Sequence, residues 1–457
     1  MTIALRGVQK IDCRVDCAKA CGDNVTKSAA RWERVMQKDT LDPEIEYGCS
    51  EDIRDVIAAL GRTEDVRFSP TRQLLAVVSF IKNNITVFGT SIARSEGTKK
   101  IILTDVTQIS SKYLNGPHGI DFIDVDKIIV ANREGYACIF DLPKTTGNHE
   151  LEPAVIIRSR DVATPGSVAV IKEDDTYEAL ICNNYGHSVT RHRLDLNARY
   201  STHTEVLLKK GLEVPDGICF SRKKEWVALS SHNTHAVLLY RNDSSLNELS
   251  EPDGILRGNF CPHGLRFTTD DRFILVADAA APYVNIYQND GLDWGGVHYP
   301  LLSFPVLSNE DFLRGRSNAE EGGPKGIDIE HSTNVIATTC EMQPLAFFDL
   351  DAILGSACEA KSVPESNYSL SKDWRRKQKF LEVNYELELQ NLDQQSKTTN
   401  PKVREMMNSR SWRITAPLRW MTAKLRGLRA SGSYLAGPRV MTLLDQRKKE
   451  KSVPIAE

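Results

Sequence analysis

The chain has 457 residues, of which 41% are hydrophobic and 26% charged, a composition that is ordinary for a globular protein and excludes a mostly disordered one. Its formal net charge of −3 is unevenly spread: residues 371–457 hold 19 of the 58 basic and 9 of the 61 acidic residues, a net of +10 that leaves −13 for the rest. An acidic body argues against a nucleic-acid partner, and no stretch approaches the roughly 20 apolar residues of a membrane-spanning helix.

Residues 1–50 are expected to form an N-terminal extension without a secretory signal. Cys13, Cys17 and Cys21 recur every four residues, which would place them on one face of a helix. A thiolate metal or iron–sulfur site is one interpretation, although familiar motifs have shorter gaps; a small-residue helical face or a poorly ordered terminus is the other. Because several of the ten cysteines sit in apolar runs, we expect free thiols and a reducing cytoplasm.

One pattern recurs six times between residues 61 and about 350. Each copy begins with a Pro-x-Gly-like turn, followed by alternating apolar residues and a second apolar run, as in PHGIDF…IIVAN. The glycine position is 47 to 62 residues from one copy to the next and is occupied by Asp65, Gly119, Ser167, Gly217, Gly264 and Gly326. Four short alternating runs per copy are typical of propeller blades. We predict an all-β fold, a six-bladed β-propeller over residues 51–355, with a helical C-terminal extension.

The sixth copy lacks an outer strand, so another segment must complete its sheet or leave an edge unpaired. Residues 52–60, DIRDVIAAL, are the candidate, and they fit a closing strand or a short helix equally well.

The residues directly before the glycine position are expected to form a ring around the propeller axis: Glu64, His118, Gly166, Asp216, His263 and Lys325. In a six-bladed ring His118 faces His263, and Glu64 faces Asp216. A neighbouring carboxylate favours imidazolium, so we expect raised histidine pKa values and predict Asp216 and His263 as a catalytic pair. The alternative is that the turn merely prefers polar residues there.

A second set of polar residues ends the second strand of each blade. It comprises Asn132, Asn183, Asn184, His232, Asn233, Asp278 and Glu341. Such groups suit a hydroxyl-rich ligand or a hard cation, although strand ends also favour Asn and Asp for turns. We predict a ligand-binding role for Asn132, Asn183, His232, Asp278 and Glu341, together with Glu64, His118 and Lys325 of the ring.

The units PHGIDF…IIVAN and PHGLRF…ILVAD resemble those of the NHL, YVTN and gluconolactonase-type propeller superfamily. Because that superfamily includes lactonases, esterase-like enzymes, carbohydrate binders and interaction platforms, the resemblance fixes no function. Gluconolactonase-type enzymes hold a divalent metal in the funnel with Glu, Asn and Asp ligands. The resemblance therefore implies Asp216, in VPDGICF, as ligand of an ion such as Ca²⁺ or Zn²⁺. Gly166 departs from the expected Asn, which Asn183 or Asn184 could replace.

The basic C-terminal region divides into two predicted parts. Residues 371–395 fit a charged helix, and residues 401–457 a basic amphipathic tail. In the tail, aromatic residues and arginines alternate, and Arg410, Trp412, Arg413, Arg419 and Trp420 are the predicted membrane-binding residues. This mixture is typical of a helix that lies on an anionic membrane surface; docking on the acidic propeller or a partner, and disorder, are the alternatives.

The segment SRSWRITAPLRW (409–420) resembles one near the C-terminus of bacterial glycosyltransferases from surface-polysaccharide and O-antigen gene clusters. The resemblance implies a pathway and not a glycosyltransferase active site. Our preferred interpretation is a propeller that binds a carbohydrate-related ligand or partner glycosyltransferases, cytoplasmic and peripheral on the inner membrane. The alternatives are a metal-dependent lactonase or ester hydrolase, and an accessory scaffold whose funnel is filled by side chains. The sequence does not decide whether the protein is an enzyme.

Deletion of residues 409–457 is expected to release the protein from anionic liposomes, because it removes the tail's aromatic residues and most of its arginines. Co-sedimentation of full-length and truncated chains with vesicles of anionic and of neutral lipid measures this. Equal binding of the two chains would reject the membrane interpretation.

Overall fold

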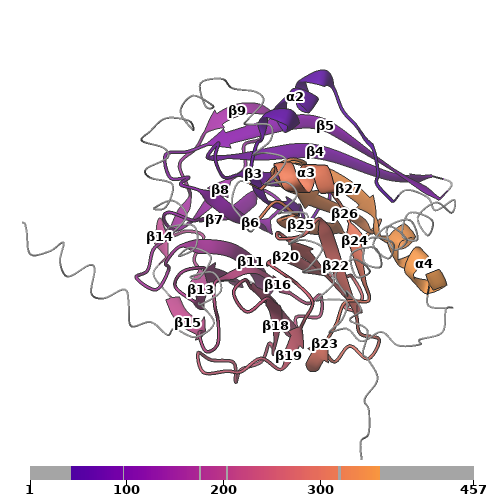
Figure 1. The fold of residues 1–457 in the computed structure, drawn as a ribbon. Helices are drawn as coiled ribbons and strands as arrows, with labels where there is room; N and C mark the ends of the chain where they lie inside the picture. The colour runs from indigo at the N-terminus through magenta and orange to yellow at the C-terminus, as the bar shows by residue number, and fades with distance from the viewer. Residues whose placement is uncertain (1–42, 96, 174–175, 202–203, 317–320, 361–457) are drawn as a thin grey trace, which may run out of the picture. The chain divides into compact units, whose positions relative to one another are not determined.

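The computed structural model describes residues 43–95, 97–173, 176–201, 204–316 and 321–360 (Figure 1). They form six sheets arranged as the blades of a β-propeller, which confirms the predicted fold. The helical extension begins with α4 (Leu350–Ala360) directly after the last strand. No helix among these residues is long and apolar enough to cross a membrane. The three N-terminal cysteines, the predicted charged helix and the predicted membrane-binding tail lie outside the described residues.

The innermost strands carry the repeated motif and stand side by side in a closed ring. In chain order they are β2 (Thr63–Phe68), β6 (Pro117–Asp124), β11 (Pro165–Glu173), β16 (Pro215–Phe220), β20 (Pro262–Phe267) and β25 (Gly326–Glu330). The second strands are β3 (Leu74–Ser79), β7 (Lys127–Asn132), β12 (Thr176–Asn183), β17 (Trp226–Ser231), β21 (Phe273–Asp278) and β26 (Val335–Thr339). All pair antiparallel with the inner strand of their blade.

The outer half of each blade is less regular. The third strands are β4 (Asn84–Ser95), β8 (Ala137–Asp141), β13 (Ser188–Leu194), β18 (Ala236–Arg241), β22 (Tyr283–Gln288) and β27 (Ala346–Asp349). The fourth strands are β5 (Thr98–Ser110), β10 (Val155–Ile157), β15 (Thr204–Leu208), β19 (Gly254–Leu256) and β24 (Leu302–Pro305). Short parallel strands are added outside: β9 (Gly147–Glu150) on β5, β14 (Tyr200–Ser201) on β10 and β23 (Gly296–His298) on β19. Each of the three comes from the following blade or its connection, so it ties neighbouring blades together.

Each junction between neighbouring blades contains one hydrophobic cluster of buried residues. Between the first two blades, for example, Val78 of β3 packs with Ile120 of β6 and Val130 of β7. The alternating pattern of each strand therefore serves two junctions, because successive side chains point to opposite faces of the blade. This explains why the strands of the described blades are mostly buried on both faces.

The sixth blade is completed by residues 43–45 rather than by residues 52–60. Ile45 N–H donates to the Phe347 carbonyl oxygen at 2.8 Å, and Asp349 N–H donates to the Pro43 carbonyl oxygen at 2.7 Å. A few residues later, β1 (Tyr47–Gly48) pairs parallel with β5 of the first blade. We call residues 43–48 the closing strap, because it joins the last blade to the first.

Residues 52–60 lie instead in a helix and its cap, so the closing-strand interpretation was wrong. In α2 (Glu51–Ala59) the Ser50 hydroxyl caps the first turn by accepting the Ile53 N–H. Ile53, Ile57 and Leu60 are buried in the cluster between the last and first blades. Their spacing of four and three residues matches one face of a helix, not of a strand. α3 (Asn309–Arg314) lies in the long interval between the fifth and sixth copies.

The repeated glycine is required by the close approach of neighbouring inner strands. A Cβ atom on Gly119 would lie 2.5 Å from the Cα of Ser167, and one on Gly217 would lie 2.0 Å from the carbonyl oxygen of His263. Non-bonded atoms do not approach this closely, so a side chain would push the blades apart. In the first blade Asp65 takes the glycine position, and its carboxylate accepts the Ile120 N–H of the next blade at 3.2 Å.

Candidate functional site

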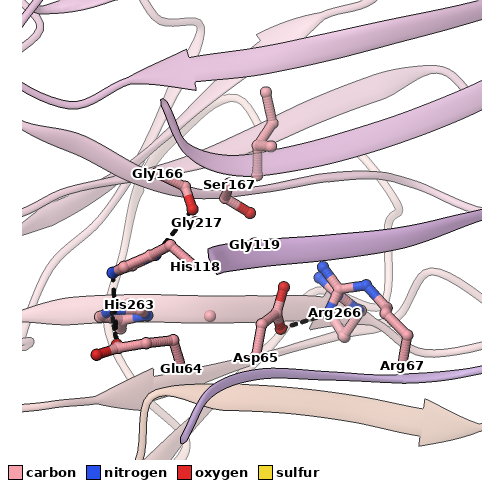
Figure 2. A pocket seen from close by; sticks show the side chains of 12 residues that line it. Glu64, Asp65, Arg67, His118, Gly119, Gly166, Ser167, Gly217, His263 and Arg266 are labelled. Carbon is pink, nitrogen blue, oxygen red and sulfur yellow. Dashed lines mark hydrogen bonds and ion pairs between the residues drawn. The ribbon is translucent and has the colours of Figure 1, made fainter. Parts of the chain in front are cut away.

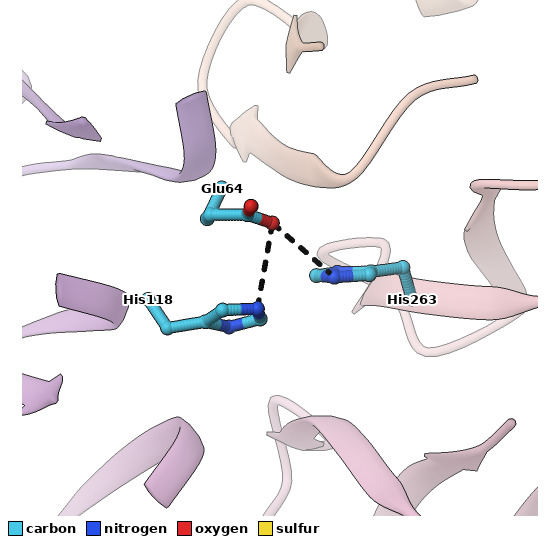
Figure 3. A group of neighbouring side chains, drawn as sticks. All are labelled: Glu64, His118 and His263. Atoms are coloured by element: carbon cyan, nitrogen blue, oxygen red, sulfur yellow. Dashed lines mark ion pairs between the residues drawn. The ribbon is translucent and has the colours of Figure 1, made fainter. Parts of the chain in front are cut away.

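The structure brings the ionisable residues of the predicted ring together on the propeller axis. Glu64, His118, Asp216, His263 and Lys325 are all buried, with at most 5% of any residue exposed. His118 and His263 face each other as predicted, with ring centroids 5.2 Å apart and planes inclined by 23°. Figure 3 shows both imidazoles directed at the Glu64 carboxylate.

The Glu64 carboxylate is held on one side and open on the other. Its Oε1 accepts from Arg62 and pairs with Lys325 Nζ at 3.2 Å. Its Oε2 lies 3.4 Å from His118 Nε2 and 3.6 Å from His263 Nε2, yet has no hydrogen-bond partner. Burial alone would raise the pKa of Glu64, but Lys325 and the other positive groups outweigh it and hold that pKa well below its usual range.

Asp216 is surrounded by nitrogen atoms. Its Oδ2 lies 3.1 Å from His232 Nε2, 3.3 Å from His263 Nε2 and 3.6 Å from an Arg133 guanidinium nitrogen. Neither carboxylate oxygen has a hydrogen bond of good geometry. Burial favours the neutral acid, but the surrounding positive groups outweigh it and hold the pKa of Asp216 well below normal. Asp216 is therefore a buried anion with unused acceptor capacity.

The expectation that neighbouring carboxylates raise the pKa values of His118 and His263 was wrong. Burial, aided by the Arg133 guanidinium, lowers the pKa of His118 to about 3, and burial lowers the pKa of His263. At His232 burial acts the same way, but contacts with Cys261 and Asp216 outweigh it and raise the pKa well above normal. Loss of hydration lowers a histidine pKa where water and charged neighbours do too little to stabilise the imidazolium.

His118 has a defined tautomer. Its Nδ1 lies 2.8 Å from the carbonyl oxygen of Gly166, which can only accept, so Nδ1 carries the hydrogen. Its Nε2 therefore has a lone pair, which accepts from the Arg133 guanidinium. Gly166 leaves room for the side chains of the polar ring. A Cβ atom on Gly166 would lie 2.5 Å from Asp216 Oδ1 and 3.4 Å from Asn184 Nδ2. This accounts for the missing Asn at that position.

Most side chains of the second predicted set form hydrogen bonds with backbone groups and do not join the ring on the propeller axis. The Asn132 oxygen accepts the Asn115 N–H at 3.2 Å, and the Asn183 oxygen accepts the Ala163 N–H at 3.0 Å. Asp278 accepts three backbone N–H groups, including that of Cys261 at 2.8 Å. These side chains hold turns. Of this set, His232 reaches the ring, and Glu341 is half-buried close enough to Arg62 to act on its charge.

Sequence reasoning missed four residues at the site. Arg62, Arg133 and Glu321 supply charge around the ring, and Cys261 contacts His232. Two carry a recognisable signal: Arg62 shares the alternation of the motif with Glu64, and Cys261 is the first residue of CPHGLRF. Arg133 and Glu321 come from irregular segments next to the axis, where no periodicity marks them.

Below the ring, a second buried layer fills the axis. Arg67 pairs with Asp65 at 2.7 Å, and Arg266 pairs with Asp328 at 2.8 Å. Burial raises the pKa of Asp65 and that of Asp121 nearby to about 6. Between the two layers is a cavity of about 10 Å³, lined by residues such as Glu64, His118 and Arg266 (Figure 2). That volume is about enough for a single water molecule or ion.

No family model and no curated protein matches the chain. Three solved structures illustrate the likeness in fold. A structural-genomics protein with a proposed gluconolactonase assignment is 12% identical with a TM-score of 0.42, covering 64% of this chain and 89% of that one. A protein of unknown function from Desulfotomaculum acetoxidans is 12% identical with a TM-score of 0.43, covering 63% and 83%. A luciferin-regenerating enzyme is 10% identical with a TM-score of 0.44, covering 64% and 94%. We base no functional argument on similarities this distant.

Proposed function

We propose that the protein is a metal-dependent hydrolase of lactones or small esters, with its reacting centre on the propeller axis. One observation carries the proposal. The Oε2 atom of Glu64, buried and without a hydrogen-bond partner, is the meeting point of the Nε2 atoms of His118 and His263. Glu64 Oε2 is a buried acceptor without a donor, and a cation there would take the His118 Nε2 lone pair in place of the Arg133 guanidinium.

The donor set fits a divalent ion. Glu64, His118 and His263 each offer one ligand atom, and these atoms lie within 4.8 Å of one another (Figure 3). Two imidazoles and one carboxylate favour zinc or a similar transition metal over calcium, which prefers oxygen ligands. Lys325 and Arg62 occupy the other Glu64 oxygen, so they orient the carboxylate without covering Oε2.

A metal in this position supplies a Lewis acid for the ester carbonyl and lowers the pKa of water. The remaining ring residues have separate tasks. Asp216 is the candidate general base, because neither of its oxygens has a hydrogen bond of good geometry and either can accept a proton. Arg133 has a guanidinium nitrogen without a partner and is placed to bind a substrate oxygen. The predicted pair Asp216–His263 is thus divided between proton transfer and metal binding.

Metal analysis and turnover of a lactone and ester panel test the proposal. Purified protein is expected to contain one ion on the axis and to hydrolyse at least one substrate. Glu64→Gln should lose that ion, while Asp216→Asn should keep it and lose about 10²–10⁴-fold in kcat. His235→Gln, on an exposed histidine of the loop that carries His232, is the matched control and should change neither. Protein that is metal-free after zinc addition and inactive on every substrate rejects the proposal.

A second candidate, a non-catalytic propeller, is favoured by the filling of the axis. The scaffold alternative expects a funnel filled by side chains, and the cavity at the ring is only about 10 Å³. Neither a sugar ring nor a lactone would reach Glu64 or His118 without moving them. The hydrolase therefore requires the ring residues to shift when substrate binds, whereas a carbohydrate ligand in surface-polysaccharide synthesis would bind above the ring. A structural plug, however, would hydrogen-bond its buried polar groups, whereas Glu64 Oε2 and both Asp216 oxygens lie near histidine nitrogens without a hydrogen bond of good geometry. For this reason we place the hydrolase first.

A further inference from the structure

A second group of metal-binding side chains lies beside the ring, towards solvent. His232 follows β17, Cys261 precedes β20, and Glu321 belongs to the segment before β25. Their ligand atoms lie within 4.8 Å of one another. The side chains of His232 and Glu321 are 11% and 19% exposed, so a solute reaches them more readily than it reaches the ring.

We propose that His232, Cys261 and Glu321 form a second metal site, selective for a thiophilic divalent ion such as Zn²⁺. Thiolate, imidazole and carboxylate are the donor types that zinc takes in proteins, and three protein ligands leave a fourth position for solvent or substrate. The sulfur ligand disfavours Ca²⁺ and Mg²⁺, which take oxygen ligands. This site goes beyond the proposed hydrolase centre and does not require that centre to be occupied.

The three side chains are already held close to a coordinating arrangement. The ligand atoms of Cys261 and His232 lie within 4.8 Å of each other, so sulfur and imidazole are adjacent. Lys325 Nζ holds Glu321 Oε2 at 2.8 Å, and an Arg62 nitrogen lies 3.6 Å from the same oxygen. Cys261 itself is fixed by its backbone N–H, which donates to Asp278 at 2.8 Å. Orientation of ligands by such neighbours is typical of built metal sites.

Asp216 connects this site to the ring. Its Oδ2 lies 3.1 Å from His232 Nε2, a ligand of the second site, and 3.3 Å from His263 Nε2, a ligand of the ring. An anion in that position favours a cation at either group by its charge and orients both histidines as a neighbour outside the two ligand sets.

Cobalt substitution tests the second site. Co²⁺ added to the metal-free full-length chain is expected to give the near-ultraviolet charge-transfer band of a thiolate–cobalt bond. Cys261→Ser should abolish the band and weaken Zn²⁺ binding at this site by more than about 100-fold, beyond the 10–100-fold effect of losing a partner outside the ligand set. Cys49→Ser, on a half-buried cysteine elsewhere in the propeller, is the matched control and should keep the band.

Two further measurements keep the result interpretable. Glu64→Gln removes a proposed ligand of the ring and none of the second site, so this variant should keep the cobalt–thiolate band. A variant that loses the ring ion and keeps the band would support the second site even where the hydrolase proposal fails. In the wild-type chain, Zn²⁺ should protect Cys261 from alkylation, as read by mass spectrometry, which needs no variant that might misfold. A band that persists in Cys261→Ser, or equal alkylation with and without Zn²⁺, would overturn the proposal. A band that disappears only when Cys13, Cys17 and Cys21 are replaced would also overturn it.

Discussion

A chain that starts at Cys49 is expected to unfold without cooperativity and to aggregate under conditions in which a chain that starts at Pro43 remains folded. The two differ only in the closing strap. Its loss leaves the edge of β27 unpaired, breaks two backbone hydrogen bonds to the last blade and the β1–β5 pairing to the first, and removes Ile45 and Tyr47 from the cluster between these blades. Burial of these two side chains and the hydrogen bonds together contribute on the order of 5 kcal/mol. That is comparable with the whole stability of a typical domain.

Calorimetry and size-exclusion chromatography of the two truncated chains measure this difference directly. The chain that starts at Pro43 is the control, because it lacks the same preceding residues and retains the strap. Ile45→Ala in the full-length chain should act in the same direction with a smaller loss of about 2 kcal/mol, since it removes a buried side chain but keeps the backbone pairing. Equal melting temperatures for the two truncated chains would show that the blades close without the strap.

The repeat made most of the fold predictable because it is local and regular. Alternating residues mark each strand, and the recurring turn marks where each blade returns to the axis. Six copies then place Glu64, His118, Asp216, His263 and Lys325 on a common circle, since identical positions in identical units meet around one axis. This is why Lys325 and Glu64, which are 261 positions apart in the chain, meet at the ring.

The features that could not be predicted from the sequence depend on contacts that leave no periodic pattern in it. The closing strap pairs with the last blade through only three residues, too few to show an alternating pattern, whereas residues 52–60 were apolar enough to suggest a strand. Arg133 reaches the ring from an irregular turn. The low pKa of His118 depends on how deeply its imidazole is buried. A sequence identifies the residue but does not show how much water still reaches it.

Gly217→Ala is expected to cost about 3 kcal/mol or more of folding free energy and to disturb the ring in the neighbouring blade. A Cβ there would lie 2.0 Å from the backbone oxygen of His263 and 3.0 Å from the Leu265 side chain. Backbone atoms cannot move aside as the end of a flexible side chain can, so β16 and β20 must separate. Such displacement of the backbone is the usual reason why overpacking lowers the free energy of unfolding. Because the displaced atom belongs to His263, the metal binding that we propose at the ring should weaken together with stability.

Chemical denaturation and zinc titration of the same variant test both effects. Gly135→Ala is the matched control, since its added Cβ would meet only the Asn132 Cβ at 3.9 Å, an ordinary contact, in a turn of the second blade. We expect it to change the unfolding free energy by less than about 0.5 kcal/mol, as surface substitutions usually do. If Gly217→Ala were as stable as Gly135→Ala, the recurring glycine would reflect turn geometry alone. The ring would then not depend on the close packing of inner strands that brings His263 next to Asp216.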